Sequence, residues 1–160
     1  MSYANRGKAL QLLINHTNQT YKMKGWAVVD EVPTPTKNIR GKMVYEKKST
    51  VDYYGITRGR AIAFDAKSTK EISRFDLKNV HDHQVKYLMD FQKQGGLSFF
   101  IIEFAKKHEH YFVPLNFFMK FWNDALKGGK KSIPYEEFLI NCSRIQSARG
   151  VPLDYIKHCG

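Results

Sequence analysis

Two acidic residues and a lysine have types and spacing that suit a metal site beside an ammonium group. Asp52 lies in the stretch STVDYYGI, and Asp65 and Lys67 lie in GRAIAFDAKST. Both stretches are rich in residues that favour strands. Because strand residues two apart share a face, Asp65 and Lys67 should point to one side. Ala63 should lie on that side and Phe64 on the other. A carboxylate among apolar residues is costly to bury unless it is paired or binds a metal ion.

A hairpin with its turn near 57–59 would bring Asp52 beside Asp65. Two such carboxylates raise each other's pKa unless a cation lies between them. Mg²⁺ or Mn²⁺ fits a site with oxygen ligands. A metal held in this way can bind a phosphodiester and lower the pKa of an attacking water, while Lys67 orients that water or neutralises developing charge. The alternative is a buried Asp–Lys ion pair at the end of a sheet, which gives the same pattern.

The tripeptide [DE]-x-K is a weak signal by itself, because the chain contains it three times. Glu46–Lys48 falls in a basic segment and Asp76–Lys78 in a polar connection. Only Asp65–Lys67 ends an apolar strand that follows another strand carrying an aspartate. This context, rather than the tripeptide, makes Asp65–Lys67 the candidate.

The charge of the chain indicates a polyanionic partner. Its 160 residues carry 26 Lys and Arg against 15 Asp and Glu, a formal net charge of +11. Nucleic acid is the favoured partner and a membrane surface the alternative. Phosphate contacts of this kind weaken steeply with salt. The candidate DNA-binding residues are Arg6, Lys8, Lys37, Arg40, Lys42, Lys47, Lys48, Arg58 and Arg60. A further basic loop, KGGKK, spans 127–131.

The pattern of elements predicts an α/β (or α+β) fold with a central mixed sheet flanked by helices. We expect a single domain, 1–160, with a protruding basic loop or ribbon at about 34–49. The expected helices are 5–23, 79–94, 114–126 and 134–140, and the expected strands are 25–32, 49–56, 59–69, 97–104 and 108–114. In the first helix, Ala9, Leu12, Leu13 and Tyr21 recur at helical spacing, with Asn5 as a candidate cap.

Histidines, aromatics and cysteines suggest no other chemistry. His81 and His83 are two apart on a helix and should not face each other. His108 and His110 share a strand face without a third ligand. The aromatic cluster of the third helix is more typical of a core or a dimer interface than of base stacking; it comprises Phe117, Phe118, Phe121 and Trp122. Two cysteines in no metal-binding pattern suit a reduced, intracellular compartment.

A resemblance adds to this interpretation. The D…DxK pattern on adjacent strands resembles the PD-(D/E)xK nucleases, and the combination of NRG, VPTPT, TVDYYG, DAK and HDHQ resembles the RecU family of Holliday-junction resolvases. The resemblance implies a restriction-endonuclease-like fold and a homodimer that cuts opposed strands of four-way DNA junctions with Mg²⁺. It implies that Asp52, Asp65 and Lys67 are catalytic, that the two aspartates bind the metal, and that Gln84 sits beside the site.

The chain departs from the family pattern at three places. Asp65 stands where members usually have Glu, and Gln11 where they commonly have Glu on the first helix. The segment that corresponds to the family's stalk, 34–49, is short. The short stalk and Gln11 would suit a phage-encoded version, and the resemblance implies a place in the bacterial cytoplasm, or in the host cell of a phage. These departures keep two alternatives open: a PD-(D/E)xK endonuclease acting on duplex or branched DNA, and a non-catalytic junction-binding protein.

Overall fold

The computed structural model describes residues 3–33, 36–45 and 50–160, and for residues 3–6 and 45 it describes the backbone alone. The basic residues predicted at positions 47 and 48, and the side chain of Arg6, therefore lie outside the described part. So does part of the expected stalk, 34–49.

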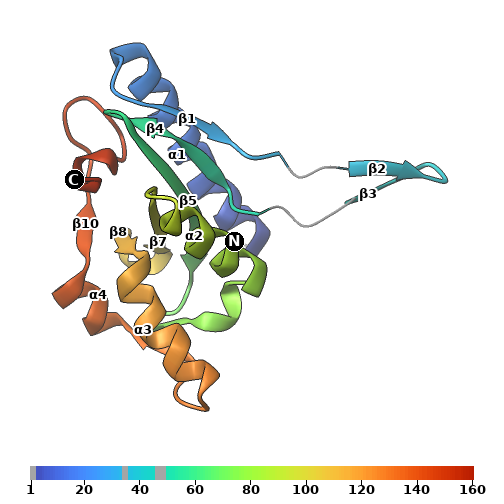
Figure 1. Cartoon of the computed structure of the whole chain (residues 1–160), viewed down its shortest axis with the longest axis vertical. Helices are drawn as coiled ribbons and strands as arrows, with labels where there is room; N and C mark the ends of the chain where they lie inside the picture. The colour runs from blue at the N-terminus through green and yellow to red at the C-terminus, as the bar shows by residue number, and fades with distance from the viewer. Residues whose placement is uncertain (1–2, 34–35, 46–49) are drawn as a thin grey trace.

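A six-stranded mixed sheet forms the centre of the molecule (Figure 1). In spatial order its strands are β1 (Val28–Glu31), β4 (Tyr53–Thr57), β5 (Arg60–Thr69), β7 (Leu97–Phe104), β8 (Glu109–Pro114) and β10 (Ser143–Ile145). The pair β5–β7 is parallel, and every other neighbouring pair is antiparallel. The crossover between the parallel strands contains α2, as parallel pairing requires. The predicted fold class is confirmed.

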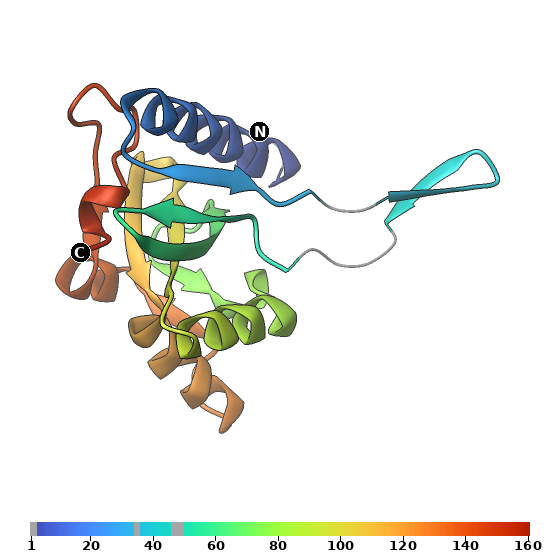
Figure 2. The same cartoon turned by 45° about the horizontal axis from the view of Figure 1, so that its top comes forward.

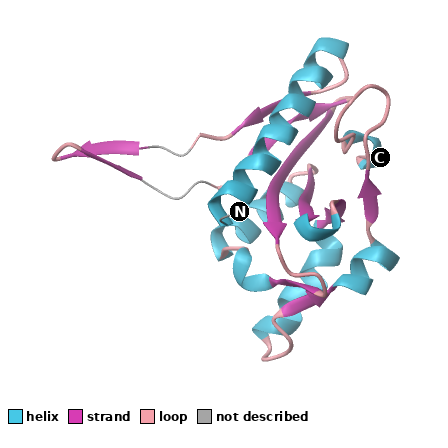
Figure 3. Cartoon of the chain, turned by 180° about the vertical axis from the view of Figure 1, so that it is seen from behind, coloured by secondary structure: helices cyan, strands magenta, loops and turns pink. Residues whose placement is uncertain are grey.

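Helices cover both faces of this sheet. Helix α1 lies along one face, and α2 and α3 lie on the other (Figures 2 and 3). The helices are α1 (Tyr3–Lys24), α2 (Asp82–Lys93), α3 (Leu115–Leu126) and α4 (Tyr135–Asn141), with short 3-10 turns η1 (Leu77–Asn79), η2 (Ala105–Lys107) and η3 (Ile156–His158). Each predicted helix is present within a few residues of its expected bounds.

Strand β5 separates two hydrophobic cores by simple alternation. Ile62 and Phe64 belong to the core beneath α1, whereas Ala63 belongs to the core beneath α2 and α3. In the first core, the ring of Phe99 stacks on Phe64 and on Phe112, with centroids 4.7 and 4.3 Å apart. The central strand is therefore buried on both sides, and its register decides which side chains reach each face.

The sequence misplaced the buried stripe of α1. Of the predicted set, Tyr21 is buried and Leu13 is partly buried, but the side chain of Leu12 is 66% exposed. Leu10 and Ile14, which were not in the set, are buried. Asn5 lies within the helix rather than at its cap. The helix carries polar residues on its inner side, which weakens the apolar periodicity on which the prediction depended.

A second, two-stranded sheet forms a ribbon that projects from the body (Figure 1). Strands β2 (Thr36–Ile39) and β3 (Lys42–Tyr45) pair through a two-residue turn. The turn residues Arg40 and Gly41 have φ of 52° and 80°, and a primed hairpin turn requires positive φ at both positions. The predicted basic loop or ribbon is thus a β-hairpin over its described residues.

A third small sheet, β6 (Arg74–Asp76) with β9 (Ser132–Pro134), was not predicted, nor was β10.

Gly55 allows β1 and β4 to approach closely, which gives a stability prediction. A Cβ at this position would lie 2.1 Å from the carbonyl oxygen of Val28. We expect Gly55→Ala to lower the free energy of unfolding by about 3 kcal/mol, at the upper end of overpacking costs, because backbone must move. Chemical denaturation measures this. Gly7→Ala is the control: a Cβ there meets nothing within 4 Å, and a helical Gly→Ala should stabilise by about 0.5–1 kcal/mol. Equal changes in the free energy of unfolding for the two substitutions would contradict the close approach of β1 and β4 at Gly55.

Candidate active site

The candidate site lies where β4 and β5 stop pairing. Their last paired residues at this end are Tyr53 and Phe64, so Asp65 begins the stretch of β5 that β4 no longer covers. Asp52 occupies a bend just before β4 rather than the strand itself, which corrects the predicted position. Asp65 is also not at the end of its strand, because β5 continues to Thr69. The unpaired side of β5 leaves room and free main-chain donors beside the acids.

Reciprocal hydrogen bonds fix the two aspartates against each other. The main-chain N–H of Asp52 donates to Oδ1 of Asp65 at 3.1 Å. The main-chain N–H of Ala66 donates to Oδ2 of Asp52 at 2.9 Å. Each carboxylate is thus held by the backbone of the segment that carries the other. The sequence-based hypothesis that the two acids converge is borne out by this geometry.

Asp65 is fully buried and has two further polar neighbours. Gln84 of α2 donates from Nε2 to Oδ1 of Asp65 at 3.3 Å, and the ammonium group of Lys67 lies 3.0 Å from Oδ2. Gln84 is itself held at the start of its helix, where its Oε1 accepts from the N–H of His81 at 3.0 Å. The position expected for Gln84, beside the site, is the one it occupies.

Burial and mutual repulsion alter the protonation of Asp52. Loss of solvent and the nearby charge of Asp65 raise the pKa of Asp52 to about 7, while the N–H of Ala66 and the charge of Lys67 act in the opposite direction. In the metal-free protein Asp52 therefore takes up a proton near neutral pH. A bound cation removes this penalty, because it favours the charged form of both acids.

An open hollow of about 400 Å³ gives solvent access to Asp52 and Lys67. It is lined by Gly7, Lys8, Gln11, Asp52, Ala66, Lys67 and Ser68, from the first turns of α1, the bend before β4 and the unpaired part of β5. Ser68 and the Ala66 N–H were not singled out in the sequence. Alternation placed them opposite Asp65, and no motif marks a main-chain donor.

The residues present fit one hard divalent cation. Oδ2 of Asp65 is buried and pairs with the ammonium group of Lys67 at 3.0 Å, as in the Asp–Lys ion pair that the sequence left open. A cation at this oxygen would share it with Lys67, whereas the carboxylate of Asp52 lines the open hollow. Two carboxylates with remaining positions for water and phosphate are the usual protein contribution to a Mg²⁺ site. No group of three or more His, Cys, Asp or Glu suited to a metal occurs among the described residues. The set therefore suits a site completed by water and substrate.

The predicted DNA-binding residues fall in three places. Lys8 lines the hollow beside the acids. Lys37, Arg40 and Lys42 are exposed on the projecting ribbon. Arg58 and Arg60 flank the far turn of the β4–β5 hairpin, and a strand rises about 3.3 Å per residue, so Arg60 begins about 17 Å from Asp65. Neither arginine lines the hollow, and DNA contact at that end of the sheet stays a prediction.

The histidines that invited a metal interpretation have other roles. The rings of His81 and His83 stack at 5.6 Å, contrary to the expectation that they would not face each other, because His81 caps α2 in an extended conformation and is not part of the helix. Nε2 of His110 lies 2.8 Å from Glu103, whose other carboxylate oxygen accepts from Ser68 at 2.6 Å.

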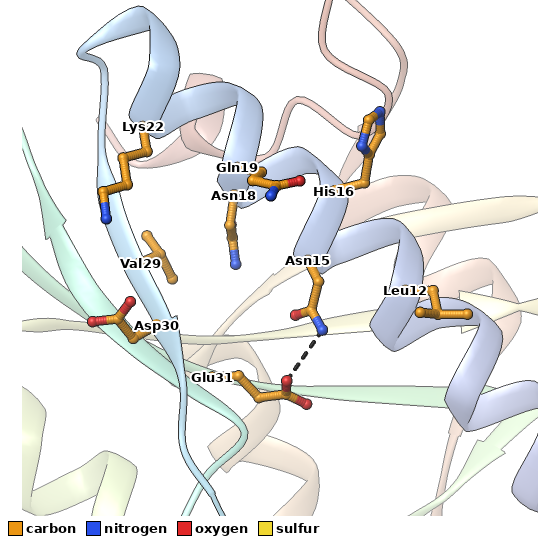
Figure 4. A pocket seen from close by; sticks show the side chains of 9 residues that line it. All are labelled: Leu12, Asn15, His16, Asn18, Gln19, Lys22, Val29, Asp30 and Glu31. Carbon is orange, nitrogen blue, oxygen red and sulfur yellow. Dashed lines mark hydrogen bonds between the residues drawn. The ribbon is translucent and has the colours of Figure 1, made fainter.

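A wider hollow between α1 and β1 lies outside the site (Figure 4). Its polar groups come mainly from α1, and Asn15 donates to Glu31 across it at 3.1 Å. Asn15 also accepts from the hydroxyl of Tyr53 at 2.9 Å, next to Asp52. The hydrogen bonds of Asn15 thus connect α1 to β1, the strand that precedes the ribbon, and to Tyr53 of β4. Neither candidate metal ligand, Asp52 or Asp65, lines this hollow.

The raised pKa of Asp52 gives a pH prediction for the chelated, metal-free protein. The folded state binds a proton on Asp52 up to about pH 7, while the unfolded state releases it near the ordinary pKa of an aspartate, 3.8. The native state then holds more protons on Asp52 between these limits, so the contribution of Asp52 to stability should fall as pH rises from 4 to 7, by at most about 1.4 kcal/mol per pH unit. Asp52→Asn should flatten this dependence. Urea unfolding at pH 4.5, 5.5, 6.5 and 7.5 measures it, and an unchanged slope in Asp52→Asn would contradict it.

The phenylalanine-rich third helix has the structural role that was expected. Phe117 and Phe118 are buried, and Phe121 and Trp122 pack partly buried against the same core.

Within the described residues, no helix combines the length and apolar character needed to cross a bilayer.

Comparison with known proteins identifies relatives of this chain. The chain is 36% identical over 147 residues to the Holliday junction resolvase RecU of Geobacillus sp. (strain WCH70), covering 85% of this chain and 73% of that protein. It is 36% identical over 168 residues to the Holliday junction resolvase RecU of Bacillus pumilus (strain SAFR-032), covering 98% and 80%. A solved structure of Archaeoglobus fulgidus Hjc, a Holliday junction resolvase, aligns with a TM-score of 0.48 and 12% identity over 79% of this chain and 92% of that one. The family model described as RecU, Recombination protein U, matches residues 5–160, and the chain belongs to this family.

Proposed function

We propose that this protein is a Holliday junction resolvase: a metal-dependent endonuclease that cuts opposed strands of four-way DNA junctions in recombination and repair. The observation that carries the proposal is the convergence of Asp52, Asp65 and Lys67 beside one open hollow, which Asp52 and Lys67 line and behind which Asp65 is buried. Relatives at about one-third identity, which match along most of their length, are named as resolvases of this kind. The net charge of +11 suits a DNA substrate.

Asp52 and Asp65 would hold Mg²⁺, for which Mn²⁺ substitutes. The ion, when bound, supplies Lewis-acid chemistry, which polarises the scissile phosphate and lowers the pKa of water. The two acids are suited to this because their side chains are held against each other and Asp52 lines the open hollow. Mg²⁺ is preferred over softer ions because the donors are oxygen atoms.

Lys67 and Gln84 would complete the catalytic set from two sides of Asp65. The ammonium group of Lys67, at 3.0 Å from Oδ2, is placed to hydrogen-bond the attacking water and to offset negative charge that develops on the phosphate. Gln84 contacts Oδ1 of the same carboxylate and acts as a positioning residue. Because its amide oxygen also caps α2, Gln84 ties the orientation of Asp65 to a helix end.

The DNA would reach the hollow along basic surfaces. Lys8 lies at the hollow itself and Lys37, Arg40 and Lys42 lie on the exposed ribbon, where they meet phosphates near the centre of a junction. Arg6, Lys47, Lys48, Arg58 and Arg60 complete the proposed set of DNA contacts. A homodimer presents two such sites related by a two-fold axis, which matches the two opposed strands of a junction. The whole chain, 1–160, would act as one nuclease domain with the ribbon as its insertion.

The site assignment predicts a separation of binding from cutting. Asp65→Asn keeps the shape of the side chain and an oxygen that accepts from the Asp52 N–H, but it removes the charge. We expect strand cleavage of a four-way junction to fall at least about 100-fold, in line with the loss of a charged group that acts in the transition state. Affinity for the junction should change less than about threefold. Cleavage at the wild-type rate would show that the assignment is wrong.

Substrate and metal preference are tested together. Cleavage rates on a four-way junction and on linear duplex of the same sequence, each with EDTA, Mg²⁺, Mn²⁺ or Ca²⁺, should give fast paired nicks on the junction with Mg²⁺ or Mn²⁺ alone. Faster cutting of the duplex would favour a general PD-(D/E)xK endonuclease. Tight junction binding without cleavage under any metal would favour a binding protein without catalysis.

A further inference from the structure

We propose that the loop between α3 and β9, together with η1, forms a second phosphate-binding surface, which holds the backbone of a junction arm beside the cut. We call it the arm surface and define it by Lys78, Lys127, Lys130 and Lys131. The inference rests on the proposed function, because it names a further contact with the same DNA.

The lysines of the arm surface line two neighbouring hollows. Lys78 and Lys131 line one hollow with Trp122 and Asp82, and Lys127 and Lys130 line the other with Asp124. The elements are joined directly, since the N–H of Leu77 donates to the carbonyl of Lys131 at 3.0 Å and β6 pairs with β9. Lys78 and Lys131, far apart in sequence, thus line the same hollow, and the loop that carries Lys131 also carries Lys127 and Lys130.

These ammonium groups are available to an outside anion. All four lysine side chains are exposed, and none forms an ion pair within the part of the chain that is described. Two aspartates line the same hollows, so the hollows carry a net charge of +2. Lys86 provides the contrast, because its ammonium group lies 2.9 Å from Asp90.

The loop is held in shape before any ligand arrives. Gly128 has φ of +87°, and the N–H of Gly129 donates to the carbonyl of Asp124 at 2.8 Å. A Cβ at Gly129 would lie 2.7 Å from that same oxygen, so the turn is close-packed. A loop that is already ordered loses less conformational entropy on binding, which favours its use as a contact.

The arm surface begins next to the catalytic residues. Asp82, at its edge, lies two residues before Gln84, which contacts Asp65. Successive phosphates of one DNA strand advance about 3.4 Å along the duplex. On this proposal the cut strand continues from the catalytic residues past the start of α2, where Lys78 and Lys131 would meet its phosphates.

The alternative is that these lysines are solvent-exposed charges that contact no DNA. The salt dependence of DNA binding separates the two, since each phosphate contact contributes about 0.9 to the slope of log K against log salt. The test pair is Lys130→Gln with Lys131→Gln. The matched control is Lys22→Gln with Lys93→Gln, which removes the same charge from the exposed last turns of α1 and α2. A third variant, Lys130→Arg with Lys131→Arg, keeps the charge.

Junction affinity is measured by fluorescence anisotropy in EDTA from 50 to 300 mM NaCl. We expect the slope to fall by about 1.8 for the Gln test pair, by less than about 0.5 for the control pair, and not at all for the Arg pair. Thermal melting should be alike for all proteins. A test-pair slope equal to that of wild type, or to that of the control, overturns the arm surface.

The outcome is independent of the proposed catalysis. Wild-type protein that binds junctions but cuts nothing would contradict the resolvase proposal, while the slope comparison would still decide the arm surface. If wild type cuts junctions and the test pair keeps the full slope, the resolvase proposal stands and the arm surface does not.

Discussion

Two carboxylates must lie side by side in a poorly hydrated place, and their mutual repulsion is the constraint around which this site is built. Asp52 and Asp65 are held by each other's backbone segments, through the N–H groups of Asp52 and Ala66. Those donors are available because β4 stops covering β5 at Phe64. The repulsion that remains raises the pKa of Asp52 to about 7, so a cation relieves it. The point at which β4 and β5 separate therefore sets both the repulsion between the two carboxylates and the attraction of this place for a cation.

The same divergence connects the site to the rest of the molecule. Asp52 follows the segment that returns from the ribbon, and its carbonyl accepts from the N–H of Val32 on the outgoing side at 2.7 Å. Gln84 ties Asp65 to the start of α2. The ribbon, the catalytic hollow and the start of α2 thus meet at Asp52 and Asp65, which suits a protein that must place one phosphate of a branched DNA.

Much of the fold could be predicted because its strongest signals are local. Strands such as 97–104 and helices such as 79–94 have clear composition and punctuation, and the alternation of Ile62, Ala63 and Phe64 in β5 was read correctly. The short strands β6, β9 and β10 were not predicted, because a strand of three residues is too short to show a period-two pattern. The buried side of α1 was misjudged because Thr17 and Asn18 face inward and Leu12 faces out. Tertiary packing overrode the local pattern there.

The residue types and their order were enough to predict a candidate chemistry: an aspartate and a lysine two apart on a buried strand, a second aspartate on the preceding segment, and a basic chain. It also carried the motifs of the family. Only the tertiary structure decided that Asp52 sits in a bend, that Ala66 and Gln84 orient the acids, and that Arg58 and Arg60 lie at the far end of the hairpin. The physical reason is that side-chain identity and alternation are encoded residue by residue, whereas the point at which two strands separate depends on packing across the whole sheet.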